Sequence, residues 1–215
     1  RDSVELYEQL RSLKKRWNNR TTKELAQLNE PILSRLRELN TAKKQFHALL
    51  RYSTYLHSRG LPVESSRSLR EAWKLAENIN NPFLKAHFSL EVGNMFRAKM
   101  PSVALPYYEE AERLYAELNQ LPNLGTTLYE YASLLYQNHD FQGSLIKMQA
   151  ADSVFRLIRN PTLSIQQLHR SALNTTGLAL FKLNRNREAL TMFDTALAMT
   201  IGVDDNLWKG LITGN

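Results

Sequence analysis

The 215-residue sequence contains no cysteine, which excludes disulfide bonds, thiolate metal sites and cysteine nucleophiles. It has no apolar run close to the roughly 18 residues that a transmembrane helix needs. No stretch alternates apolar and polar residues between hairpin turns, so a β-sheet is not expected. Phosphate-binding glycine loops, His-Glu-x-x-His pairs, nucleophile elbows and kinase motifs are absent as well. We therefore expect a non-catalytic segment with no cofactor and no metal.

The five histidines do not change this expectation, because no two of them are four residues apart, the spacing that forms a metal-binding face on a helix. They are His47, His57, His87, His139 and His169. The acidic cluster Glu109, Glu110 and Glu112 is most simply a solvated helix face.

Positive charge is concentrated near the start of the chain. Residues 1–60 carry 13 Lys and Arg against 6 Asp and Glu, whereas residues 61–215 carry 15 of each. The densest point is Lys14, Lys15 and Arg16. A basic segment can bind nucleic acid or an anionic surface, and it can equally be an ordinary solvated helix face. A nucleic-acid or anionic-surface binder therefore stays open as an alternative function.

A small residue is followed four positions later by a large apolar one, and three after that by alanine, at four places in the chain. The sets are Ser65, Leu69, Ala72; Ala104, Tyr108, Ala111; Ser144, Met148, Ala151; and Ala189, Phe193, Ala196. Their first members are 39, 40 and 45 residues apart. Self-similarity at such a period is typical of stacked-repeat proteins.

Helical periodicity of the apolar residues runs through nearly the whole sequence. From Asn40 onward it predicts paired helices near 41–58, 62–79, 82–98, 101–118, 122–137, 141–158, 163–183 and 186–200. The separators contain proline, which suits a first helical turn, or asparagine, which tolerates left-handed backbone at a helix end. Before them we expect a helix with an apolar stripe from Val4 to Trp17, and a second one near Thr22–Leu39. Pro31 either kinks this second helix or begins a fresh one capped by Asn29.

The helix pairs resemble tetratricopeptide repeats (TPRs), whose first helix carries a small residue and an aromatic one. The second helix of that family has small, aromatic and alanine positions at the spacing described above. The best unit is Ala172–Thr200, with Gly177, Phe181, Ala189, Phe193 and Ala196. The resemblance implies an all-α, right-handed superhelical solenoid of antiparallel helix pairs. The long period is similar to that of the repeats in bacterial sensory and regulatory proteins.

In this register the chain divides into a cap, four repeats and a partial fifth. Residues 1–39 are expected to form an N-terminal helical cap or a degenerate repeat. The repeats are expected at 40–80, 81–120, 121–160 and 161–203. Leu211–Asn215 echoes Leu90–Asn94, which predicts that 204–215 is the truncated first helix of a fifth repeat. We therefore expect the sequence to be part of a longer protein, in either an extracytoplasmic or a cytoplasmic setting.

In TPR arrays the first helices line the concave face, and the resemblance therefore implies a set of groove residues. By register they are Arg51, Thr54, His57, His87, Glu91, Asn94, Arg97, Tyr129, Ser133, Tyr136 and Asn174. Among the positions of the carboxylate clamp of chaperone-binding members only Asn94 fits, since Leu50, Leu90 and Tyr129 stand at the others. Binding of chaperone C-terminal tails is thus not expected.

The function that follows is recognition of a protein or peptide, or of a small ligand, by a sensor or scaffold region of a larger bacterial signalling or regulatory protein. Besides the nucleic-acid alternative, a helical regulator that acts on a partner enzyme stays open.

Overall fold

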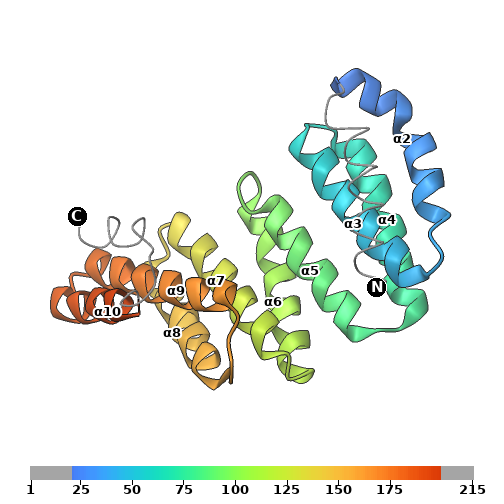
Figure 1. Cartoon of the computed structure of the whole chain (residues 1–215). Helices are drawn as coiled ribbons and strands as arrows, with labels where there is room; N and C mark the ends of the chain where they lie inside the picture. The colour runs from blue at the N-terminus through green and yellow to red at the C-terminus, as the bar shows by residue number, and fades with distance from the viewer. Residues whose placement is uncertain (1–20, 200–215) are drawn as a thin grey trace. The chain divides into compact units, whose positions relative to one another are not determined.

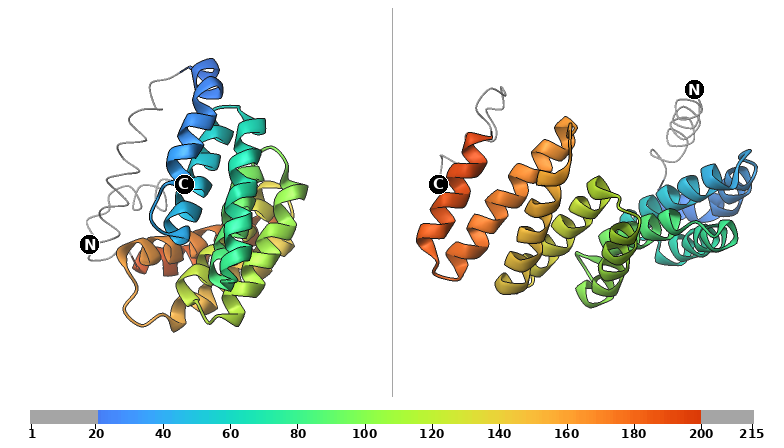
Figure 2. Two further views of the ribbon diagram at one scale, coloured as in Figure 1. Left: turned by 90° about the vertical axis from the view of Figure 1, so that its right-hand side faces the viewer. Right: turned by 90° about the horizontal axis from the view of Figure 1, so that it is seen from below.

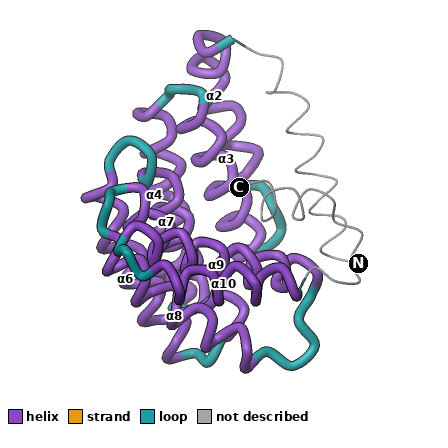
Figure 3. The backbone as a smooth tube through the Cα atoms, turned by 90° about the vertical axis from the view of Figure 1, so that its left-hand side faces the viewer, coloured by secondary structure: helices purple, strands orange, loops and turns teal. Residues whose placement is uncertain are grey.

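The computed structural model describes residues 21–199, and in that range the chain consists of helices joined by short turns (Figures 1 and 3). The helices are α2 (Thr22–Arg37), α3 (Ala42–Ser58), α4 (Pro62–Ile79), α5 (Pro82–Phe96), α6 (Pro101–Glu117), α7 (Leu121–Gln137), α8 (Phe141–Leu157), α9 (Leu163–Lys182) and α10 (Asn186–Ala198). The expected all-α class is confirmed. The expected helix between Val4 and Trp17 and the expected partial repeat at 204–215 lie outside the described residues.

Helix ends follow the turn residues of the sequence. Proline stands in the first turn of α4, α6 and α7. Left-handed backbone occurs, as expected, at Asn80, Asn160 and Asn184, whose φ angles are 48°, 54° and 60°. In the turn before α8, however, His139 rather than Asn138 takes this conformation, with φ 64°. This turn therefore also contains one left-handed residue, and His139 takes that conformation in place of Asn138.

Of the two possibilities left open at Pro31, a fresh helix does not form. Helix α2 runs unbroken from Thr22 to Arg37 with Pro31 inside it, and Asn29 is buried on its packed face. The helix begins instead at a capping box, in which the Thr21 hydroxyl accepts from the Glu24 backbone N–H at 3.3 Å. The Glu24 carboxylate in turn accepts from the Thr21 backbone N–H at 2.8 Å. This reciprocal pair satisfies two otherwise unpaired donors.

Packing divides the chain into two compact units, 1–91 and 92–215, with the boundary inside α5. In the first unit α3 and α4 lie side by side, and α2 packs against both (Figure 1). Two buried serines of α4 hold it to α3: Ser65 Oγ donates to the Ser53 carbonyl at 2.9 Å, and Ser68 Oγ to the Leu49 carbonyl at 2.7 Å. The small residue that starts the first repeat motif therefore gives room for close approach and also satisfies a backbone carbonyl.

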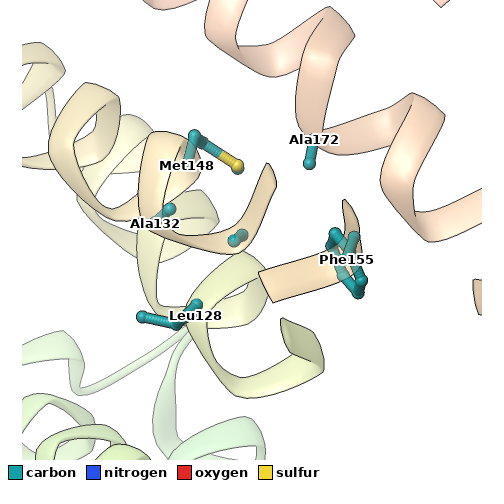
Figure 4. Packing of buried hydrophobic residues seen from close by; sticks show 6 residues of the cluster. Leu128, Ala132, Met148, Phe155 and Ala172 are labelled. Atoms are coloured by element: carbon teal, nitrogen blue, oxygen red, sulfur yellow. The ribbon is translucent and has the colours of Figure 1, made fainter. Parts of the chain in front are cut away.

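In the second unit each helix from α6 to α10 packs against the next (Figure 2). One buried cluster joins three of them, and its members are Leu128 and Ala132 of α7, Met148, Ala151 and Phe155 of α8, and Ala172 of α9 (Figure 4). The alanines that close the four motifs are all fully buried. The repeated pattern therefore describes packing between helices, as the sequence predicted.

Candidate functional site

A hollow of about 320 Å³ opens in the second unit between the end of α5, one face of α7, and α9. Its lining residues are Arg97, Tyr129, Glu130, Ser133, Tyr136, Gln137, Thr175 and Leu178. Five of them belong to α7, at positions i, i+1, i+4, i+7 and i+8, which is the spacing of one helix face. We refer to this feature as the α7 hollow.

The two tyrosines of the α7 hollow are held by the core beneath them. Tyr129 packs against the cluster of Figure 4, and Tyr136 packs against a second cluster formed by Leu145, Ala179, Leu180 and Ala189. The ring of Tyr136 also lies edge-on to Phe141, with ring centroids 5.3 Å apart. Rings fixed in this way lose little conformational freedom when a ligand contacts them.

The charges that line the α7 hollow neutralise each other. Arg97 Nη1 pairs with Glu130 Oε2, and both side chains are about three-quarters buried, with exposures of 24% and 22%. The Ser133 hydroxyl donates to the Tyr129 carbonyl at 2.8 Å, so its oxygen can still accept a hydrogen bond. The surface therefore offers aromatic rings, hydroxyls and an amide around a neutral ion pair. It suits an uncharged group with apolar and hydrogen-bonding parts better than a strongly charged one.

Four of the eleven predicted groove residues come together here: Arg97, Tyr129, Ser133 and Tyr136. Asn174 is partly buried on α9, next to the lining residue Thr175. Asn94 has a different role, because its Oδ1 accepts a 2.7 Å hydrogen bond from the hydroxyl of the buried Tyr108. That contact ties α5 to α6 and uses the amide oxygen of Asn94 as an acceptor.

The other five predicted residues belong to the first unit. Arg51, Thr54 and His57 stand on α3, and His87 and Glu91 on α5. Thr54 Oγ1 donates to the Leu50 carbonyl at 3.1 Å, within its own helix. The His87 ring lies against the ring of His47, with centroids 5.4 Å apart. These residues do not contribute to the α7 hollow, and the role of all eleven in binding stays a prediction.

Sequence reasoning did not identify Glu130, Gln137, Thr175 and Leu178. Two signals could have found three of them. Gln137 continues the spacing of Tyr129 and Ser133 by one more turn of α7. Thr175 and Leu178 stand 45 residues after Glu130 and Ser133, the offset that separates the last two motifs. The pairing of Glu130 on α7 with Arg97, just after the end of α5, joins two residues 33 positions apart and has no sequence signature.

Within residues 21–199, no three His, Asp or Glu side chains come together as metal ligands. In the same part of the chain, no helix is both long enough and apolar enough to cross a membrane.

No protein-family model matches the sequence, and no curated protein does. Two solved structures are similar in fold. BtubC (BKLC) from P. vanneervenii has a TM-score of 0.72 and 14% identity, and the match covers 94% of this chain and 84% of that one. A putative kinesin light chain from Podosopora anserina with nearly identical TPR-like repeats has a TM-score of 0.66 and 11% identity, covering 94% of this chain and 96% of that one.

The fold is TPR-like. The structural likeness therefore confirms the resemblance that the small–large–alanine pattern indicated. At such low identity it shows the fold alone. The boundaries of the individual repeats stay predictions.

Proposed function

We propose that this chain is a non-catalytic recognition module that binds a protein or peptide segment on the side formed by its first helices. TPR-like solenoids generally act as interaction scaffolds, and their repeats present extended binding surfaces. The observation that carries the proposal is the α7 hollow. It lies on the first helices of the third and fourth predicted repeats, and it collects four of the residues predicted for the groove.

The chemistry of the α7 hollow supports a peptide as the ligand. Its volume of about 320 Å³ is at the lower end of small-molecule sites and suits one or two side chains of a longer ligand. Tyrosine and arginine are enriched among residues that dominate binding energy. The hydroxyls and the amide of Gln137 can pair with the backbone N–H and C=O groups of an extended segment. A segment with an apolar or aromatic anchor and no charge at that anchor is the expected ligand class.

The long spacing of the repeats favours a sensor or scaffold region of a bacterial signalling or regulatory protein. This part of the proposal depends only on the similarity of the period to the repeats of such proteins. A helical regulator of a partner enzyme would use the same surface and differ in what it binds.

Filling the α7 hollow tests the proposal. Peptides are selected on the purified protein from a random-peptide display library, and their affinities are measured by calorimetry. Ser133→Phe places a ring inside the hollow without removing any core contact. The matched control is Ser153→Phe on α8, where the exposed serine makes the same kind of bond, donating to the Gln149 carbonyl at 2.9 Å.

We expect Ser133→Phe to weaken the selected peptides by at least about tenfold, because a blocked pocket loses its anchor contacts. Ser153→Phe should bind them like the wild type, and both variants should keep the helicity of the wild type. Equal binding to Ser133→Phe and wild type would show that the hollow is not the site. A selection that yields no peptide would also count against the proposal.

A further inference from the structure

The first unit carries a second surface of different character, on α3 and α5, which are the first helices of the first two predicted repeats. Lys43, His47 and Arg51 are spaced four residues apart on α3, and His87 of α5 lies against His47. Residues at this spacing share one helix face. The two imidazole rings are tilted by 58° to each other, and Phe46 packs beside His47 with centroids 5.1 Å apart. We name Lys43, His47, Arg51 and His87 the α3 basic stripe.

The charge of the α3 basic stripe is not neutralised by the surroundings that the structure describes. Within residues 21–199 none of the four side chains forms an ion pair, whereas Arg97 in the second unit is paired with Glu130. Lys43 and Arg51 are exposed, and the two histidines are partly buried. The stripe is therefore an accessible row of positive and proton-accepting groups.

The two imidazoles are held in the neutral form while the surface is empty. Burial, together with the nearby His87, Lys43 and Arg51, lowers the pKa of His47 to about 4. Burial and Arg51 lower the pKa of His87 as well. A bound anion would reverse the electrostatic part of this effect, because it would neutralise Arg51 and favour the imidazolium.

The acidic groups of the neighbouring helices do not offset the stripe. On α2 and α4, Glu30 and Glu71 form ion pairs with Arg37. Together with burial, the charge of Glu64, also on α4, helps to raise the pKa of Tyr52. On α5 the carboxyl nearest in sequence is Glu91, one turn beyond His87, and it is not among the groups that shift the pKa of His47 or His87.

We propose that the α3 basic stripe binds the carboxylates of an acidic peptide segment, and that binding adds protons to His47 and His87 and so becomes tighter as the pH falls. This inference rests on the proposed function, because it assigns the chemistry of a second part of the ligand. The spacing fits such a segment. One step of four residues along α3 is about 6 Å, and alternate side chains of an extended peptide are about 6.6 Å apart.

A peptide is favoured over nucleic acid because the stripe holds only two groups that are charged at neutral pH. Nucleic-acid affinity depends on many simultaneous Lys and Arg contacts to phosphates. The two imidazoles, in contrast, lie against each other, and the charge of Arg51 acts on both, so a carboxylate bound at Arg51 would act on both as well. The basic cluster Lys14–Arg16 lies outside the described residues and is not included in the stripe.

The test uses fluorescently labelled hexaaspartate and measures its affinity by anisotropy at low salt, at about pH 7.5 and about pH 5.5. Hexaasparagine is the uncharged control peptide. Linkage allows affinity to rise by up to roughly tenfold per pH unit for each proton taken up. We expect hexaaspartate to bind the wild type several-fold tighter at the lower pH, and hexaasparagine not to bind.

Three variants test which residues produce the affinity for hexaaspartate and its response to pH. His47→Gln combined with His87→Gln should remove the pH response, so that the affinities at the two pH values become equal. Arg51→Gln should weaken binding at both pH values. The matched control is Arg70→Gln, which removes the same charge from an exposed position on α4 and should bind like the wild type. If Arg70→Gln weakens binding as much as Arg51→Gln, the attraction is only that of the net charge, and the inference is wrong.

An NMR titration gives an independent readout in the unmodified protein. Addition of hexaaspartate should raise the pKa of both His47 and His87, whereas the exposed His139 should not respond. An unchanged pKa at both histidines would overturn the inference. Tighter binding of a single-stranded oligothymidylate than of hexaaspartate, with the same sensitivity to Arg51→Gln, would assign the stripe to nucleic acid instead. Because the α7 hollow lies in the other unit, failure here would leave the result with Ser133→Phe standing.

Discussion

Gly125 of α7 lies so close to the ring of Phe155 of α8 that a Cβ at the glycine would be 2.5 Å from Cε1 of the ring. Gly177 of α9 has the same relation to Phe193 of α10, at 2.4 Å. At Gly93 the corresponding distance to the ring of Tyr108 is 3.1 Å, so a methyl group there would require the ring to move by only a few tenths of an ångström. Glycine is thus used in the second unit to admit an aromatic ring from a neighbouring helix.

We predict that Gly125→Ala destabilises the protein although it places a better helix former in α7. Alanine would favour the helix by about 1 kcal/mol. Phe155 is only 3% exposed and is fixed in the cluster of Figure 4, so it cannot yield to the new methyl group. Overpacking of this kind costs about 1–3 kcal/mol and should outweigh the gain. Phe193 is partly exposed, and Gly177→Ala should therefore cost less.

Urea unfolding of both variants and of the wild type measures this difference. A Gly125→Ala protein as stable as the wild type would show that the ring moves aside freely.

The sequence was sufficient to predict the helices and the positions that pack between them. Apolar periodicity and the turn residues placed the paired helices within a few residues of their observed ends, because both signals are local. The small–large–alanine pattern likewise identified Ala104, Tyr108 and Ala111, all of which are fully buried. The pattern could identify these contacts because the same positions recur in each helix pair.

Contacts that do not repeat could not be predicted in this way. Gly125 and Phe155 stand outside the pattern, and the pairing of Arg97 with Glu130 depends on how α5 and α7 approach each other. The register predicted that Asn94 faces the groove, but it could not show that Tyr108 would donate to its amide. The α7 hollow itself is a shape, and its depth depends on the side chains of three helices.

The repeat register makes a second prediction about Leu145 and Leu190, which stand 45 residues apart at equivalent positions. Leu145 is 2% exposed beneath Leu180 and Ala189, whereas Leu190 is 62% exposed. Leu145→Ala should therefore cost about 2–5 kcal/mol, the usual range for a core leucine. Leu190→Ala should change stability by about 0.5 kcal/mol or less.

Thermal and urea unfolding of the two single variants check this pair directly. Equal losses at both positions would mean that Leu190 is covered in solution by a surface that residues 21–199 do not supply.

A third prediction concerns the contribution of Asn94 to stability, as distinct from any role in binding a ligand. Asn94→Ala removes the acceptor of the Tyr108 hydroxyl, and Tyr108→Phe removes the donor. Each change should cost about 1–2 kcal/mol, and the double variant should show a coupling of about 1 kcal/mol. Asn94→Asp keeps an acceptor oxygen and should restore most of the stability. A double variant whose loss is the plain sum of the two single losses would rule out the pairing. Reduced ligand binding by Asn94→Ala would not by itself show that Asn94 contacts the ligand.

The last prediction concerns the pH dependence of stability and follows from His47. Its pKa in the folded protein is about 4, below the ordinary value of 6.5. Between these values the unfolded chain binds a proton that the folded protein does not. The free energy of unfolding must therefore be highest above about pH 6.5 and must fall as the pH falls towards 4. His87, whose pKa is also lowered, acts in the same direction.

Urea midpoints at about pH 7 and about pH 5.5 measure the effect before most carboxylates titrate. The wild type should lose about 1 kcal/mol from His47 over this interval, a value reduced for the partial exposure of the ring. The His47→Gln variant should lose less unfolding free energy between the two pH values than the wild type does. The double variant His47→Gln, His87→Gln should lose less than the single variant. His139→Asn is the control, because His139 is exposed and asparagine tolerates its left-handed backbone. If His139→Asn flattens the profile as much as His47→Gln does, the imidazoles of the α3 basic stripe are not the groups that couple stability to pH.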